Sequence, residues 1–170
     1  MDADLTPAPS LIGNPMTVEA RLAELGIVLP FVPASSGSFL PHRFAGPLLF
    51  LSGQTARDES GMRLTGIVPT AVSVEEAYRR ARLTGLQLLA NAQAALGSLD
   101  RVEAVVKVFG MVYATLDFKD HPTVINGCSD LFEDVLGPAG RHARSAVGMG
   151  SLPHGISVEI EAILLVRPDA

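Results

Sequence analysis

The clearest hydrophobic pattern in the chain is a helical repeat that ends at Gly97. It opens with Ser73 and Glu76, whose S-x-x-E spacing is that of a helix capping box. The apolar positions that follow recur every three or four residues and are mostly small: Val74, Ala77, Tyr78, Ala81, Gly85, Leu88, Ala92 and Ala95. This pattern predicts a long helix that lies close against a sheet.

Two further segments have helical patterns. Pro122, in the first turn after Asp120, begins an amphipathic segment that Gly137-Pro138 ends. Near the start of the chain, residues 17–25 predict a short helix with Thr17 as its cap and Gly26 after its last turn.

Apolar and alternating segments predict five strands. They are residues 35–42, 47–52, 102–114, 143–147 and 157–166. Alternation along the third places Val102, Ala104, Val106, Val108 and Val112 on one face. The last two strands are joined by a Pro-His-Gly turn at 153–155, and residues 54–70 indicate a loop or a ragged hairpin.

This order of elements predicts an α+β domain that spans residues 17–170. Residues 1–16 are expected to be a flexible tail, and residues 17–30 an additional helix with an extended lead-in. Two long helices cover only one face of such a sheet. The other face carries Phe109, Met111 and Tyr113, so we expect a second copy of the protein to cover it.

Composition restricts the function classes. The chain has 170 residues, a net charge of -5 and one cysteine, Cys128, which we expect to be a small core residue rather than a nucleophile. With no signal-peptide pattern and no apolar run of about 20 residues, the expectation is a soluble cytoplasmic protein without a membrane partner. The acidic balance disfavours nucleic acid as the main partner. The four histidines (His42, His121, His142 and His154) are scattered, which disfavours a metal site.

The candidate chemistry lies in the last two strands. Arg144 opens one, and Glu159 and Glu161 share a face of the other because they are two residues apart. Two interpretations stay open: a structural ion pair or exposed edge charges, and a carboxylate-binding arginine beside a carboxylate that transfers protons. Gly53 in "LSGQ" (51–54) offers close backbone approach to a ligand, and Asn126 is either near the site or exposed to solvent.

Several stretches resemble the RidA/YjgF family of reactive-intermediate deaminases, also labelled translation inhibitors or L-PSP endoribonucleases. The resemblance runs from about residue 35 to 166. It rests on "LFLSGQ", "VEAVVKVFGMV", "VINGCSDLF" and above all "ARSAVGMGSLPHGISVEIEAI", whose spacing is fixed over two strands. It implies a chorismate-mutase-like fold, a mixed sheet with two helices on one face, and a homotrimer with clefts between subunits.

The resemblance also implies roles for particular residues. Arg144 would bind the substrate carboxylate, Glu159 would orient or activate water, and Glu161 would be structural. The residues expected to line the substrate site are Ser52, Gly53, Phe39, Asn126 and Ala146. Phe39 stands where the family often has tyrosine, and Ala146 where it often has cysteine.

The implied reaction is hydrolysis of short 2-imino acids to 2-keto acids and ammonia, without a cofactor. Two alternatives remain. One is a non-catalytic trimer that binds small carboxylates or a protein. The other is an endoribonuclease, which the absence of a histidine pair and of a basic stretch disfavours.

Overall fold

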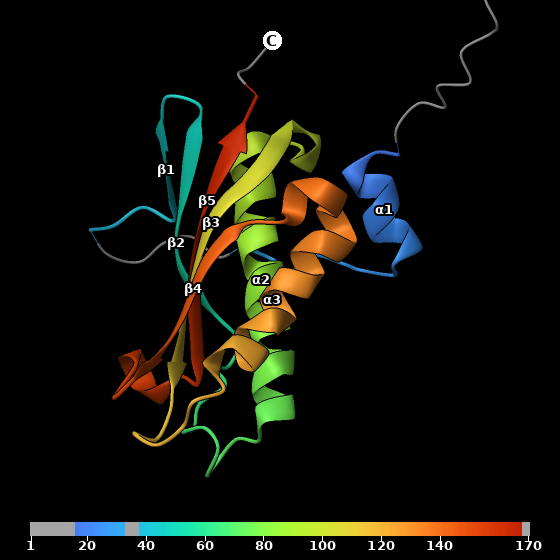
Figure 1. Ribbon diagram of the computed structural model, residues 1–170. Helices are drawn as coiled ribbons and strands as arrows, with labels where there is room; N and C mark the ends of the chain where they lie inside the picture. The colour runs from blue at the N-terminus through green and yellow to red at the C-terminus, as the bar shows by residue number, and fades with distance from the viewer. Residues whose placement is uncertain (1–15, 33–37, 168–170) are drawn as a thin grey trace, which may run out of the picture.

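The computed structural model describes residues 16–32 and 38–167 and is built on one mixed five-stranded sheet (Figure 1). The strands are β1 (His42–Ala45), β2 (Leu48–Thr55), β3 (Val102–Tyr113), β4 (Ala143–Met149) and β5 (Val158–Val166). Their order is β1-β2-β5-β3-β4; β3 and β4 are parallel and the other neighbours antiparallel. The predicted α+β fold is confirmed, whereas the predicted tail lies largely outside the described residues.

Two long helices lie on the same face of the sheet, as predicted. They are α2 (Val74–Leu96), which lies over β2 and β5, and α3 (His121–Leu136), which lies nearest β3 and β4. The Ser73 side chain accepts a hydrogen bond from the Glu76 N–H, which confirms one half of the predicted capping box. The Glu76 carboxylate instead accepts hydrogen bonds from Arg79 and Arg80.

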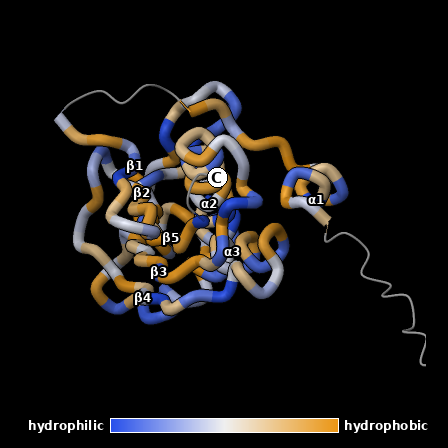
Figure 2. Tube along the Cα trace, turned by 90° about the horizontal axis from the view of Figure 1, so that it is seen from above, coloured by the Kyte–Doolittle hydropathy of each residue, from blue (hydrophilic) through white to orange (hydrophobic). Residues whose placement is uncertain are grey.

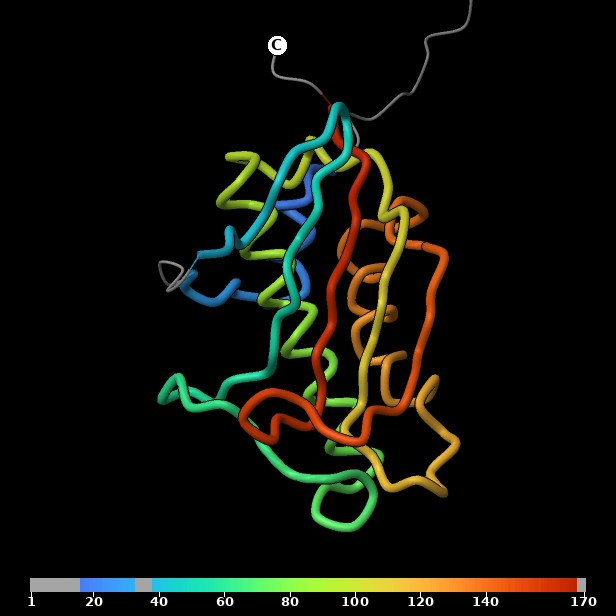
Figure 3. The backbone as a smooth tube through the Cα atoms, turned by 90° about the vertical axis from the view of Figure 1, so that its left-hand side faces the viewer, coloured from blue at the N-terminus to red at the C-terminus, as the bar shows by residue number. Residues whose placement is uncertain are grey.

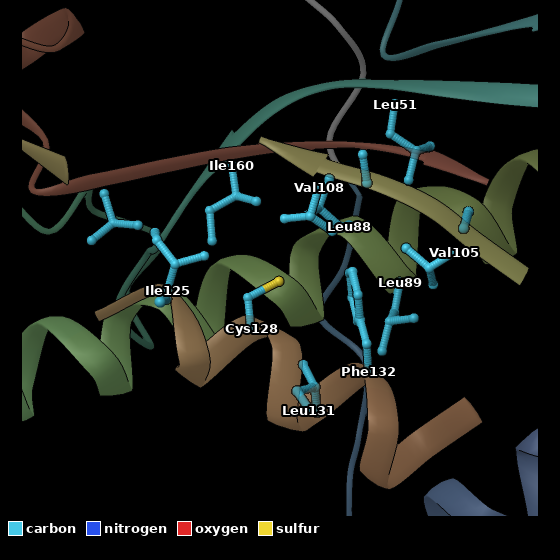
Figure 4. Close-up of a cluster of buried hydrophobic side chains, with 14 of the residues drawn as sticks. Leu51, Leu88, Leu89, Val105, Val108, Ile125, Cys128, Leu131, Phe132 and Ile160 are labelled. Carbon is cyan, nitrogen blue, oxygen red and sulfur yellow. The ribbon is translucent and has the colours of Figure 1, made fainter. Parts of the chain in front are cut away.

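The core lies between these helices and the sheet (Figure 4). Its largest fully buried side chains include Phe132, Leu49, Leu88 and Ile160. Cys128 lies among them with no exposed surface, and burial raises the pKa of its thiol far above its ordinary value. The prediction that Cys128 is a core residue is confirmed.

The first strand was predicted too early in the chain. The predicted strand covered residues 35–42, but β1 begins at His42, residues 38–41 form no strand, and residues 33–37 lie outside the described part. The cause is a two-residue hairpin turn at Gly46-Pro47, with Gly46 at a φ of 58°, which pairs Ala45 with Leu48. A turn fixes the register of the strands that flank it, so β1 consists of the residues just before Gly46.

The predicted alternation along β3 is wrong in its first half. Val105 is buried and Val106 is 41% exposed, the reverse of the prediction. The pairing of β3 with β5 shifts register between Val102 and Ala104 and again between Val105 and Lys107. Such bulges move the following side chains to the other face, so that alternation holds only from Lys107 onward.

The face of the sheet turned away from the helices is not covered by any described element (Figure 3). Phe109, Met111 and Tyr113 lie there, half-buried, and Phe50 is 40% exposed. We call this surface the open face. The apolar character of the open face matches the prediction from the sequence. That further copies of the protein cover this face stays a prediction.

The short helix α1 (Val18–Glu24) packs on the far side of the helical layer (Figure 2). Leu22 enters the core, and the Val18 N–H donates to Asp100 Oδ1 at 2.7 Å. Within residues 16–32 and 38–167, no helix has the length and apolar composition of a membrane span.

Candidate active site

Arg144 is fixed on the helix-covered side of the edge strand β4. Its register neighbour Val108 is fully buried under the helices. The guanidinium Nη1 donates to Asn126 Oδ1 at 2.8 Å and to Ser129 Oγ at 2.9 Å, both on α3. Nε and Nη2 have no hydrogen-bond partner in the described chain. The arginine is therefore anchored by one nitrogen, and the edge that binds carboxylates bidentately is left free.

Behind Arg144 lies a second hydrogen-bonded pair. Ser129 Oγ is 3.0 Å from His142 Nε2, and His142 Nδ1 is 2.6 Å from the Gly140 carbonyl oxygen. Because that carbonyl only accepts, Nδ1 carries the proton and Nε2 accepts from Ser129, whose oxygen then accepts from Arg144. Burial lowers the pKa of His142, opposed by the Gly140 hydrogen bond and aided by the Arg144 charge. His142 thus holds the Ser129 hydroxyl proton, which leaves the oxygen lone pairs of Ser129 to accept from the arginine.

Glu159 lies on the open face of β5, directly across the ladder from Thr55. It is half-buried, and burial raises the pKa of its carboxyl, with the Glu161 charge as the second cause. Gly53 lies against it: a Cβ atom at Gly53 would collide with Glu159 Oε1. The glycine thereby lets the backbone and the Glu159 carboxylate approach closely; that Gly53 also lets a ligand approach stays a prediction. A raised pKa makes the ionised carboxylate a stronger base, which suits a group that accepts and returns protons.

Arg144 and Glu159 do not meet within one chain. They lie on opposite faces of the sheet, with β3 between β4 and β5. Glu161 shares the open face with Glu159, as predicted from their spacing. An ion pair between Arg144 and either glutamate is therefore absent from the described chain.

A cavity of about 460 Å³ adjoins Glu159. Phe39 and Gly53, two of the predicted site residues, line it together with Glu159. Arg57 and Arg63, from the polar segment 54–70, line the same cavity. Its volume is in the range of small-molecule sites, about 300–1,000 Å³.

The other predicted site residues lie elsewhere. Ser52 donates its hydroxyl to the Leu40 carbonyl at 2.7 Å and lines a separate hollow with Glu161. Ala146 lies beside Gly110 and packs against the core, on the same face as Arg144. Asn126 is the Arg144 anchor rather than a solvent-facing residue.

The sequence analysis does not predict four residues that lie at or near the site: Ser129, His142, Arg57 and Arg63. Two local signals point to the first pair: Ser129 follows Asn126 by three residues on α3, and His142 precedes Arg144 by two. The arginines carry a weaker signal, because the polar segment 54–70 indicates only a loop or a ragged hairpin. In the described part of the chain, no three His, Cys, Asp or Glu residues form a group able to hold a metal ion.

Comparisons with a family model, with a related protein and with solved structures all give matches that cover most of this chain. Residues 19–157 match the model of the family described as "YjgF/chorismate mutase-like, putative endoribonuclease". Protein TCP17 of Trypanosoma cruzi is 40% identical over 148 residues, 86% of this chain and 92% of that protein. A solved structure of an Agrobacterium tumefaciens protein of unknown function is 41% identical, covers 89% of this chain and 94% of its own, and has a TM-score of 0.81. A solved structure from Shewanella oneidensis, described as "a putative endoribonuclease", is 28% identical, covers 88% of this chain and 99% of its own, and has a TM-score of 0.84.

Proposed function

Because this chain belongs to the YjgF/chorismate mutase-like family, we propose that it hydrolyses reactive 2-imino acids to 2-keto acids and ammonia. The observation that carries the proposal is the free edge of Arg144. A half-buried guanidinium held by Asn126 and Ser129, with Nε and Nη2 unpartnered in the described chain, fits a bidentate carboxylate.

The chemistry then requires only water and proton transfer. Glu159 accepts a proton from water as the oxygen adds to the imine carbon and then returns it to the imine nitrogen, which gives a neutral carbinolamine. Glu159 then passes the hydroxyl proton of the carbinolamine to its nitrogen, so that the carbonyl forms, the carbon–nitrogen bond breaks and ammonia leaves. The raised pKa of Glu159 supports this role, since a carboxylate of ordinary pKa is a weaker base at neutral pH. The reaction involves no redox change and needs no cofactor.

The site is assembled between copies in this proposal. Arg144 and Glu159 lie on opposite faces, so one chain cannot present both to one small substrate. The open face offers an apolar surface for a neighbouring copy, consistent with the homotrimer expected from the sequence. Arg144 of one subunit would then face the Glu159 cavity of the next.

The test is Arg144→Lys, which keeps the charge but loses the planar fork. A charge-assisted hydrogen bond is worth about 1.5–3 kcal/mol, so we expect a roughly ten- to hundredfold loss in 2-keto acid affinity. Hydrolysis of the imine released by a threonine dehydratase, with the unaided rate subtracted, should be largely lost.

Arg141→Lys is the matched control, because Arg141 is exposed and binds Glu133 rather than the site. It should hydrolyse like the wild type. An Arg144→Lys variant with wild-type hydrolysis would contradict the proposal. Wild-type protein that binds 2-keto acids through Arg144 without accelerating hydrolysis would establish the non-catalytic binder instead.

An endoribonuclease is the second candidate, favoured by the family description and by one observation. The cavity beside Glu159 also has His154, Arg57 and Arg63 in its lining, a set that contains a base, an acid and phosphate-binding groups. Cleavage of a short labelled RNA by the wild type, abolished in Glu159→Gln and unaffected in Arg144→Lys, would favour it. No cleavage by the wild type would eliminate it.

A further inference from the structure

Two arginines face one another across the hairpin that follows β2. Arg57 and Arg63 are partners in an isolated antiparallel bridge, and the tip between them is a turn closed by Asp58. Like charges directly opposite each other in such a pair destabilise it. Both arginines line the same cavity as Glu159, so an anionic ligand bound in that cavity would offset this repulsion.

No protein carboxylate in the described chain neutralises either arginine. Asp58, which follows Arg57 in the chain, is used in the turn: it accepts from Ser60 Oγ at 2.6 Å and from the Met62 N–H at 2.9 Å. Arg57 Nη1 donates to the Gly61 carbonyl oxygen at 2.8 Å, and Arg63 has no hydrogen bond in this part of the structure. Most of their donors are therefore free for a ligand.

The hairpin is joined to the start of β5 rather than standing alone. The Leu64 N–H donates to the Ala56 carbonyl at 3.1 Å, and the Ser157 N–H donates to the Leu64 carbonyl at 3.2 Å. Thr65 forms a further bridge with Ile156. In Figure 3 the hairpin (teal to green) and the loop before β5 lie at the same end of the sheet. The backbone that carries Arg57 and Arg63 is thus held at a fixed place relative to Glu159.

The alternation of the chain directs Arg57 to the Glu159 side. Ala56 is buried, so Thr55 and Arg57 share the opposite phase, and Thr55 lies directly across from Glu159. Two residues of extended chain span about 6–7 Å, so Arg57 lies roughly that far beyond Thr55. The arginines do not pair with Glu159, whose pKa shift comes from burial and from Glu161. The cavity is therefore lined by the Glu159 carboxylate and, apart from it, by the guanidinium groups of Arg57 and Arg63.

From this arrangement we infer that the preferred substrate carries a second anionic group on its side chain, which Arg57 and Arg63 bind. The inference rests on the proposed function: Arg144 of a neighbouring copy holds the carboxylate next to the imine, and Glu159 acts at the imine carbon. The substrate class is then a 2-imino acid with a distal carboxylate or phosphonate. The cavity volume of about 460 Å³ leaves room for such a chain.

The test compares three keto acids that differ at the far end. We would measure the affinities of 2-ketobutyrate, 2-ketoglutarate and 3-phosphonopyruvate for the wild type and for the Arg57→Gln/Arg63→Gln double variant by calorimetry. The expected result is a roughly tenfold or greater loss for the two dianionic acids and less than about a twofold change for 2-ketobutyrate. The relative affinities of 2-ketoglutarate and 3-phosphonopyruvate for the wild type show which distal anion fits.

Lys119→Gln is the control, since it removes one positive charge from an exposed loop residue that does not line the cavity. It should change none of the affinities. An equal loss for 2-ketobutyrate in the double variant would overturn the inference, because the arginines would then bind the first carboxylate. Wild type with no preference for the dianionic acids would also overturn it, as would RNA cleavage that depends on Arg57 and Arg63.

The result separates this inference from the proposed function. If Arg144→Lys weakens all three acids while the double variant weakens none, the proposed function stands and the second anion site fails. If Arg144→Lys has no effect on any acid, the proposed function itself fails.

Discussion

Ionisation of the Glu159 carboxyl affects both the rate of hydrolysis and the stability of the fold. Burial, and then the neighbouring Glu161 charge, raise the pKa of its carboxyl. Since the ionised form is the base, hydrolysis should increase with pH through a range above the ordinary glutamate pKa. In Glu161→Gln the second cause is removed, so this acid limb should move to lower pH. A rate-against-pH profile with an unmoved limb would contradict the assignment of Glu159 as the base.

The raised pKa of Glu159 also makes the free energy of unfolding depend on pH in a defined direction. The folded state favours protonated Glu159, so its contribution to stability is present below the unfolded pKa and is lost as pH rises through the raised folded pKa. Urea unfolding of Glu159→Gln should therefore show a smaller decline across that window than the wild type. An identical pH dependence in both proteins would mean that the carboxyl titrates normally.

Gly53 allows a prediction that separates catalysis from folding. A Cβ atom at Gly53 would collide with the Glu159 carboxylate, which is the end of a flexible side chain and can move away. Gly53→Ala should therefore reduce hydrolysis about tenfold or more, because a displaced base is costly, and change stability by less than about 1 kcal/mol. Kinetics and thermal unfolding check both halves.

The matched control for this change is Gly150→Ala. A Cβ atom there meets nothing within 4 Å, so neither rate nor stability should change appreciably. Equal losses of activity in Gly53→Ala and Gly150→Ala would show that the Glu159 contact is irrelevant.

At the scale of elements, α1 is attached to the fold by Leu22 and by polar contacts that do not involve the site. Leu22 is 6% exposed, and Arg21 Nε donates to the Asp134 carbonyl at 2.9 Å. Leu22→Ala should lower the free energy of unfolding by about 2–4 kcal/mol, with hydrolysis unchanged well below the melting temperature. Leu116→Ala, at a fully exposed leucine, should have little effect on either. A loss of activity in Leu22→Ala would connect α1 to the site.

Elements with strong local signals were predicted well from the sequence, and irregular ones were not. The cap at Ser73 and the Gly137 stop placed the two long helices within a residue or two of their observed ends. The bulges in β3 leave no composition signal, so the faces of Val105 and Val106 were exchanged. The Gly46-Pro47 dipeptide is a turn signal in the sequence, and this turn, rather than the residues before His42, decides where β1 lies.

The site was only partly predictable because it depends on the whole molecule. The alternation of β5 correctly placed Glu159 and Glu161 together. It does not show that Arg144 lies on the other face, because that depends on the parallel register of β3 and β4. The anchors Ser129 and His142 come from different elements, and no short pattern encodes their contact. Tertiary register, rather than local sequence, decides which charges share a face.

The separation of Arg144 from Glu159 leads to a test of assembly. If each site takes its arginine from one copy and its glutamate from another, then Arg144→Lys and Glu159→Gln chains, each inactive alone, should complement one another. After unfolding and refolding equal amounts together, about a quarter of the sites would combine an intact arginine with an intact glutamate, so about a quarter of the wild-type rate should return. Refolding each variant alone provides the control. Sedimentation equilibrium should show a trimer in every sample, because neither residue forms an ion pair with another charge within residues 16–32 and 38–167 of its own chain. Trimers without recovered activity would mean that both residues serve from the same chain, and monomers would mean that the open face is not an interface.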